Sequence, residues 1–178
     1  MIKRDDAILA VIDVQQRLIP VIDCGDDVCV AIERLVKGMN VLGVPILLTE
    51  QYPAALGRTV ETLNCTITSK AIEKISFSCC GSVEFDSALC DADRPHVIVA
   101  GVETHVCVYQ TVRDLLDEAY DVSVVVDAVG SRSPSDKEIA IRRIEALGAS
   151  LTSVEMILFD LLESADDESF KKILRIVK

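Results

Sequence analysis

The sequence is short of basic residues. It has 18 Lys and Arg against 29 Asp and Glu, which gives a formal net charge of −11. Binding to nucleic acid without regard to sequence requires Lys and Arg clusters that neutralise phosphates, and no such cluster stands out. The same balance argues against docking on an anionic membrane. We therefore expect no nucleic-acid partner and no membrane partner.

Long apolar runs are also missing. No segment approaches the roughly 20 apolar residues that cross a bilayer. The N-terminal stretch is charged, and the apolar run after it is interrupted by Asp13, which does not fit a signal peptide. These features predict a cytoplasmic protein.

Ligands for a structural metal are few. The seven cysteines include no Cys-x-x-Cys pair, and only His96 and His105 would add imidazole ligands. An odd number of cysteines in 178 residues does not fit a small disulfide scaffold either. We expect reduced, mostly packed thiols, and neither a metal nor a cofactor.

The sequence does have short apolar runs that alternate with longer amphipathic segments. Runs that are apolar throughout, separated by helices, predict a parallel sheet buried on both faces. We predict one α/β domain over residues 1–178, with a three-layer α/β/α, Rossmann-like, doubly wound and mostly parallel sheet. The expected strands are 7–12, 46–48, a short one within 70–77, 97–100, 122–126 and one near 151; the expected helices are 26–42, 82–90, 104–119, 133–148, one from 152 and one after 168.

Reactive side chains follow several of these strands. Ligands bind beyond the carboxyl ends of the strands in such sheets. Asp13 directly follows the first strand, Lys74 lies in the short strand within 70–77, and Cys107 lies seven residues after Ala100. These three residues are therefore candidates for one site.

Cys107 lies where a glycine turn leads into a helix. The positive end of a helix dipole and a nearby cation such as Lys74 both favour a thiolate. Unpaired amides in the first helical turn, that of Cys107 among them unless Thr104 caps it, would stabilise an oxyanion. Position alone fits equally well a cysteine that is only a small buried hydrophobe.

Neither histidine suits Cys107 as a base. His96 begins its strand, at the opposite edge of the sheet from Cys107. His105 is two residues before Cys107, and such neighbours point about 200° apart around a helix. A proton from the thiol would therefore go to a carboxylate, and Asp13 is the best placed.

These segments resemble the isochorismatase-like cysteine hydrolase superfamily. The resemblance rests on three segments and covers nearly the whole chain. Further matches to the isochorismatase domain-containing branch are 49–53, 56–57, 127–128 and 131–133. The three main segments are Ala10–Gln15, Lys74–Ser78 and Gly101–Cys107.

The resemblance implies a catalytic triad of Asp13, Lys74 and Cys107. Cys107 would be the nucleophile and Asp13 the general base, while Lys74 would stabilise both negative charges. It also implies a cis peptide bond between Val102 and Glu103, with the backbone amides of Glu103 and Cys107 forming an oxyanion hole.

The sequence departs from two branches of this superfamily. The nicotinamidase branch has a metal site with histidines after the second strand, whereas residues 49–57 here contain no histidine. Isochorismatase itself cleaves a vinyl ether without relying on this cysteine. Cys107 therefore favours acyl transfer.

The leading hypothesis is a cysteine hydrolase that cleaves the C–N bond of a small amide through a thioester on Cys107. Gln51, Tyr52 and Phe77 are candidate walls of the substrate pocket, although Tyr52 and Phe77 fit a place in the core as well. One alternative is a binding or oligomeric scaffold with little or no turnover. Another is a redox thiol protein, with Cys79 and Cys80 as possible partners of Cys107. High apolar content with few aromatic residues permits the homo-oligomer that is common in the family.

Overall fold

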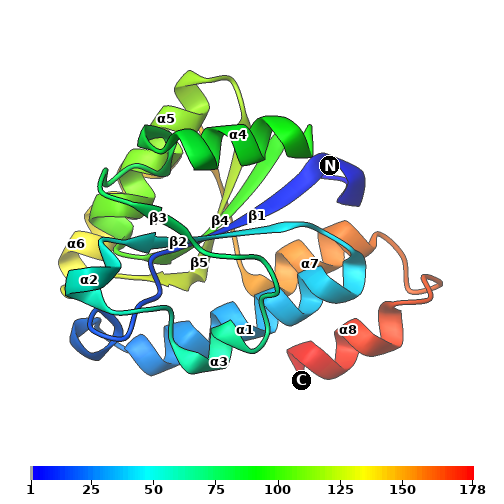
Figure 1. Cartoon of the computed structure of the whole chain (residues 1–178). Coiled ribbons are helices and arrows are strands. Elements are labelled where there is room, and N and C mark those ends of the chain that lie inside the picture. Colours follow the sequence, from blue (N-terminus) through cyan, green and yellow to red (C-terminus); the bar gives the residue numbers. More distant parts are fainter. Residues whose placement is uncertain (1) are drawn as a thin grey trace.

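The computed structural model describes residues 2–178. Its centre is one six-stranded parallel sheet with the strand order β3-β2-β1-β4-β5-β6 (Figure 1). The sheet confirms the predicted doubly wound α/β architecture. The strands are β1 (Ala7–Ile12), β2 (Ile46–Gln51), β3 (Ile72–Lys74), β4 (His96–Val102), β5 (Asp121–Gly130) and β6 (Ser150–Thr152).

Helices cover both faces of the sheet and complete the three layers. Helices α1, α7 and α8 pack on one face, and α4, α5 and α6 lie on the other (Figure 1). Two short helices, α2 and α3, lie between β2 and β3. The helices are α1 (Gly25–Leu42), α2 (Pro53–Leu56), α3 (Glu61–Asn64), α4 (Val83–Ala92), α5 (Tyr109–Asp117), α6 (Pro134–Ala146), α7 (Val154–Leu162) and α8 (Phe170–Val177).

Four short segments wound more tightly or more loosely than an α-helix accompany these helices. Three are 3₁₀ turns and one, which contains Cys107, is a π-helical turn. They are η1 (Arg4–Asp6), η2 (Ile19–Val21), η3 (Cys79–Gly81) and η4 (Thr104–Val108).

The strand order reverses direction between β1 and β4, which is the point where such sheets bind ligands. There Ile12, the last residue of β1, pairs with Gly101 near the end of β4. Gly101 has a φ of +123°, and a Cβ on it would lie 2.1 Å from the carbonyl oxygen of Ile12. Only glycine fits, so the two strand ends approach closely at the switch point.

Three strands are longer than predicted. β2 continues through Thr49, Glu50 and Gln51, β4 runs on to Val102, and β5 continues to Gly130 after a register shift against β4. The polar end of β2 resembles a loop in the sequence, but its side chains are buried and hydrogen-bonded. The Thr49 hydroxyl donates to Asp13, the Glu50 carboxylate accepts from Thr59, and the Gln51 amide accepts from Lys74 and donates to the Ile75 carbonyl. Partners of this kind are invisible to a local pattern.

Two helix boundaries also differ from the prediction. The segment after β4 begins with η4, and its helix ends at Asp117, so Ala119 lies outside it at a φ of +65°. Thr152 ends β6, and Ser153 caps α7 by accepting a hydrogen bond from the Met156 amide at 3.3 Å.

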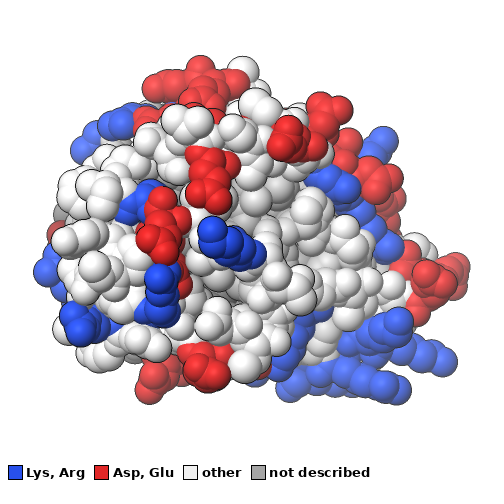
Figure 2. Space-filling model, in the orientation of Figure 1, with Lys and Arg blue, Asp and Glu red and all other residues white. Residues whose placement is uncertain are grey.

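The surface in Figure 2 is largely uncharged, and Lys and Arg side chains gather at lower right, over α8. This basic group was not among the features predicted from the sequence. Within residues 2–178, every helix is too short or too polar to traverse a bilayer.

Candidate active site

Asp13 and Lys74 form a buried ion pair beyond the carboxyl ends of β1 and β3. The Lys74 Nζ lies 2.7 Å from the Asp13 Oδ2, and neither side chain is exposed to solvent. The register of the sheet brings Asp13 and Lys74 together, because Gln51 of β2 pairs with Lys74 of β3, while Val11 of β1 pairs with Leu48 of β2. Residues 61 positions apart are thus brought to one edge.

The remaining hydrogen-bonding capacity of the pair is also used. The Thr49 hydroxyl donates to the Asp13 Oδ1 at 2.7 Å, so both carboxylate oxygens are bound. The Lys74 ammonium donates further to the Gln51 side chain at 2.9 Å and to the carbonyl of Phe77 at 3.1 Å. Buried charges need such partners, and these fix the pair in one orientation.

The ammonium of Lys74 keeps its charge despite burial. Burial acts to lower its pKa, but the Asp13 charge, together with the hydrogen bond to Asp13, outweighs that effect and raises it. Lys74 is therefore a fixed positive charge that faces acidic groups.

Cys107 lies in η4, with 6% of its surface exposed. Burial raises the pKa of its thiol, the Asp13 charge raises it further, and Lys74 only partly offsets the two. The resting group is a neutral thiol, which differs from the expected preformed thiolate. The reason is that the sequence shows the helix start and the cation but not the loss of solvation.

The turn before Cys107 has the cis peptide bond between Val102 and Glu103 that the resemblance implies. The Glu103 carboxylate accepts hydrogen bonds from the backbone and the guanidinium of Arg132, each at 3.0 Å. Thr104 does not cap the helix: its hydroxyl is buried and has no hydrogen-bond partner among the described residues. The Thr104 hydroxyl therefore does not accept a hydrogen bond from the Cys107 amide.

Both histidines lie within hydrogen-bond distance of serine hydroxyls. His96 begins β4 and lies 2.8 Å from the Ser123 hydroxyl. The Nδ1 of His105 lies 3.0 Å from the Ser131 hydroxyl.

A cavity of about 320 Å³ is lined in part by Tyr52 and Lys74, but Asp13, Cys107, Gln51 and Phe77 do not line it. Gln51 is buried, and its side chain accepts a hydrogen bond from Lys74 instead. Tyr52 and Phe77 are 52% and 55% exposed, so the alternative that they belong to the core is wrong. The other lining residues are Pro53, Ala54, Glu73 and Ile75.

Two threonines that were not predicted from the sequence support the site. Thr49 holds Asp13, and Thr111 donates from its hydroxyl to the Cys107 carbonyl at 2.7 Å while accepting from the Cys79 amide at 3.0 Å. A signal existed for each: Thr49 follows an expected strand, and Thr111 is one helical turn after Cys107.

Known proteins are similar to this chain in sequence and in structure. "Isochorismatase domain-containing protein 1" of Danio rerio is 35% identical over 167 residues, which are 93% of this chain and 59% of the relative. The chain thus spans about three fifths of that relative's length.

Two solved structures superpose closely on the fold. "MAR1 Ribonuclease from Caenorhabditis elegans" has a TM-score of 0.94 and 34% identity, covering 99% of this chain and 91% of that one. YcaC from Pseudomonas aeruginosa, solved with hexane-2,5-diol and covalent acrylamide, has a TM-score of 0.91 and 26% identity, covering 98% and 90%. The family model of the isochorismatase domain matches residues 7–156. With that match over most of its length, the chain belongs to the isochorismatase domain family.

Proposed function

We propose that this protein is a cysteine hydrolase that cleaves the C–N bond of a small amide at Cys107. The observation that carries the proposal is the fully buried Asp13–Lys74 ion pair, whose two charges both act on the Cys107 thiol. A buried pair of this kind, next to a nucleophile at the topological switch point, is a typical arrangement for acid–base chemistry.

In the first half of the reaction, Asp13 takes the proton of the Cys107 thiol as its sulfur attacks the amide carbonyl carbon. The backbone amides of Glu103 and Cys107 stabilise the oxyanion that forms. The tetrahedral intermediate then collapses, Asp13 gives the proton to the leaving nitrogen, and an amine or ammonia departs. A thioester remains on Cys107.

Water completes the reaction. Asp13 removes a proton from a water molecule that attacks the thioester, and a carboxylic acid leaves as the thiol is restored. Lys74 stays charged throughout and stabilises each anionic state, which agrees with its raised pKa. The raised pKa of the Cys107 thiol also fits this scheme, because the proton must move during attack and not before it.

The covalent acrylamide in the YcaC structure supports a nucleophilic site in this fold. A covalent adduct requires a nucleophile on that protein, and acrylamide itself carries an amide. We expect acrylamide to label this chain at Cys107 in preference to the exposed Cys65 and Cys90.

The test is a screen of small amides against the wild type, Cys107→Ala and the control Cys65→Ala, with acyl-enzyme trapping by mass spectrometry. We expect Cys107→Ala to lower turnover by about 10⁴-fold or more, since loss of a nucleophile removes the covalent route. The acyl group should appear on the peptide that contains Cys107. Undiminished turnover in Cys107→Ala would disprove the mechanism.

The scaffold hypothesis predicts a different result from the same screen. If the protein only binds or assembles, no amide is turned over, and acrylamide labels Cys107 no faster than the exposed cysteines. A redox protein would instead yield a disulfide between Cys107 and Cys79 or Cys80.

An RNA substrate is suggested by the names of the Caenorhabditis elegans structure and of two Leishmania structures, each called a MAR1 ribonuclease or putative MAR1 ribonuclease. The net charge of −11 opposes the binding of a polyphosphate. Incubating RNA with the wild type and Cys107→Ala decides the matter: cleavage that is lost in the variant would replace the amide with RNA as the substrate.

A homo-oligomer and a cytoplasmic location remain part of the proposal. Apolar side chains are exposed along the segment from β3 to α4, with Ile75 71%, Phe77 55% and Val83 83% exposed. Such a patch is expected at an interface between protein chains. Light scattering of the purified chain would measure its mass in solution.

A further inference from the structure

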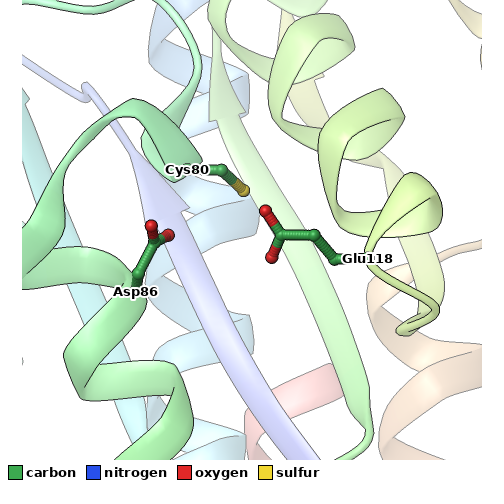
Figure 3. Close-up of side chains that lie close together, drawn as sticks. All are labelled: Cys80, Asp86 and Glu118. Carbon is green, nitrogen blue, oxygen red and sulfur yellow. The ribbon is translucent and has the colours of Figure 1, made fainter.

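A second cluster of reactive side chains lies between α4 and α5, outside the candidate active site (Figure 3). Cys80 comes from η3, Asp86 from the first half of α4, and Glu118 from the C-terminal end of α5. One ligand atom of each lies within 4.8 Å of those of the other two. In Figure 3 the Cys80 sulfur points toward the Glu118 carboxylate.

Two oxygen atoms at this cluster are enclosed without hydrogen-bond partners. The Oδ1 of Asp86 is shielded from solvent, and no described residue donates to it. The Ser78 hydroxyl, in a residue only 7% exposed, also has no hydrogen-bond partner among the described residues. It lies near Cys80, whose thiol pKa it acts to lower. Buried polar atoms are rarely left in this condition, so each calls for a partner that the protein itself does not supply.

The charge around the cluster is one-sided. Burial raises the pKa of the Asp86 carboxyl, and burial together with the Asp86 and Asp114 charges raises that of Glu118. Burial and the Glu118 charge, among others, raise the pKa of the Cys80 thiol to about 12. The neighbouring charges that act on these groups are all acidic, so a bound cation would relieve their mutual repulsion.

We propose that Cys80, Asp86 and Glu118 form a binding site for a divalent metal ion of the zinc class. One thiolate and two carboxylates suit zinc, which accepts both sulfur and oxygen ligands. Magnesium and calcium prefer oxygen ligands alone. With three protein ligands, one position of a tetrahedral ion is left for water.

Binding would release a proton and join two parts of the fold. The Cys80 thiol must lose its proton to solvent when the sulfur binds the metal. The ion would then tie η3 to the end of α5, next to Cys79 and to the segment whose carbonyls hold Lys74. The site would therefore brace one wall of the candidate active site without contacting its reacting atoms.

The test is a titration of the reduced full chain with Zn²⁺ alone, followed by competition with a chromophoric chelator. Cys107→Ala serves as the background, so that the candidate nucleophile cannot bind the ion. We expect one Zn²⁺ per chain and a rise in the midpoint of thermal unfolding. Cys80→Ser and Glu118→Gln should each weaken binding by about 100-fold or more, since even groups that only support a ligand are worth 10–100-fold.

Matched controls are Cys65→Ser, an exposed thiol elsewhere, and Glu84→Gln, an exposed carboxylate on α4; both should bind Zn²⁺ like the background. Glu118 is exposed at a helix end, so its variant will fold even if Cys80→Ser does not. The proposal is wrong if the chain binds no Zn²⁺, or if binding is unchanged in Glu118→Gln. Because the readout is binding, neither result depends on the hydrolase proposal.

Discussion

Two cysteine-containing clusters lie on neighbouring parts of the same fold, and their charges are arranged in opposite ways. At the candidate active site the Asp13 carboxylate is matched by the Lys74 ammonium at 2.7 Å, and both are fully buried. At the second cluster two carboxylates and a thiol face one another, and the charges acting on them are acidic. The first cluster is complete by itself, whereas the second lacks a positive charge.

The difference shows what each cluster can do. A balanced, fully hydrogen-bonded pair holds its charges in place during a reaction, which is what acid–base catalysis requires. An unbalanced cluster gains from an added cation, which is what a metal site requires. Removing one member should therefore have opposite consequences for stability at the two places.

The largest effect on stability is expected from Lys74→Met. It leaves the buried Asp13 carboxylate without its cation, which should lower the free energy of unfolding by about 3–5 kcal/mol. Urea denaturation measures the change. The double variant Asp13→Asn/Lys74→Met should be more stable than Lys74→Met alone, because it leaves no unpaired charge. If the double variant is the less stable of the two, the ion pair does not control stability in this way.

The next effect is a loss of stability in alkaline solution. Burial raises the pKa of the Cys79 thiol from 9.0 to about 11. A raised pKa means that the unfolded chain loses this proton first, so the stabilisation is complete below pH 9 and is lost as the pH rises to 11. The loss from this thiol is about 3 kcal/mol.

Cys79→Ala isolates that contribution, because the other cysteines remain. Between pH 9 and 11 its free energy of unfolding should fall less steeply than that of the wild type, whatever its absolute value. Equal slopes for the two proteins would show that Cys79 titrates as an ordinary exposed thiol.

A smaller effect is expected from Thr111→Val, which keeps the shape of the side chain and removes its hydroxyl. The Cys79 amide then loses its acceptor in a buried place. Leaving such a donor unsatisfied should lower the free energy of unfolding by about 1–3 kcal/mol. Denaturation gives this value, and Thr66→Val is the control, because Thr66 is partly exposed and its hydroxyl donates to the Thr62 carbonyl. A loss no larger than that of the control would remove Thr111 from the support of the site.

The smallest effect is expected from Glu118→Gln without added metal. This change reduces the repulsion in the second cluster, and it breaks no ion pair, because Glu118 forms no salt bridge within residues 2–178. Stability should stay within about 0.5 kcal/mol of the wild type, or rise. A clear destabilisation would show that Glu118 already has a structural partner and would weaken the contrast between the clusters.

Much of the fold follows from local patterns along the chain. The strand 7–12 is apolar throughout because β1 is central and buried on both faces, and Gly43 ends α1 in the left-handed conformation that favours glycine. The end of β2 was mistaken for a loop because its polar side chains have partners on distant segments. The same limit applies to Thr111, whose role depends on η3 lying beside α5.

The order of amino acids alone places Asp13, Lys74 and Cys107 at one edge of a parallel sheet, because side chains after parallel strands share that edge. It does not reveal the state of the thiol: burial beside a carboxylate raises the pKa of Cys107, and burial appears only when the layers pack. It also led us to expect no metal, since Cys80, Asp86 and Glu118 match no local ligand spacing. Only the packing of η3, α4 and α5 brings those three together, because the ligand atoms of a site need proximity in space and not along the chain.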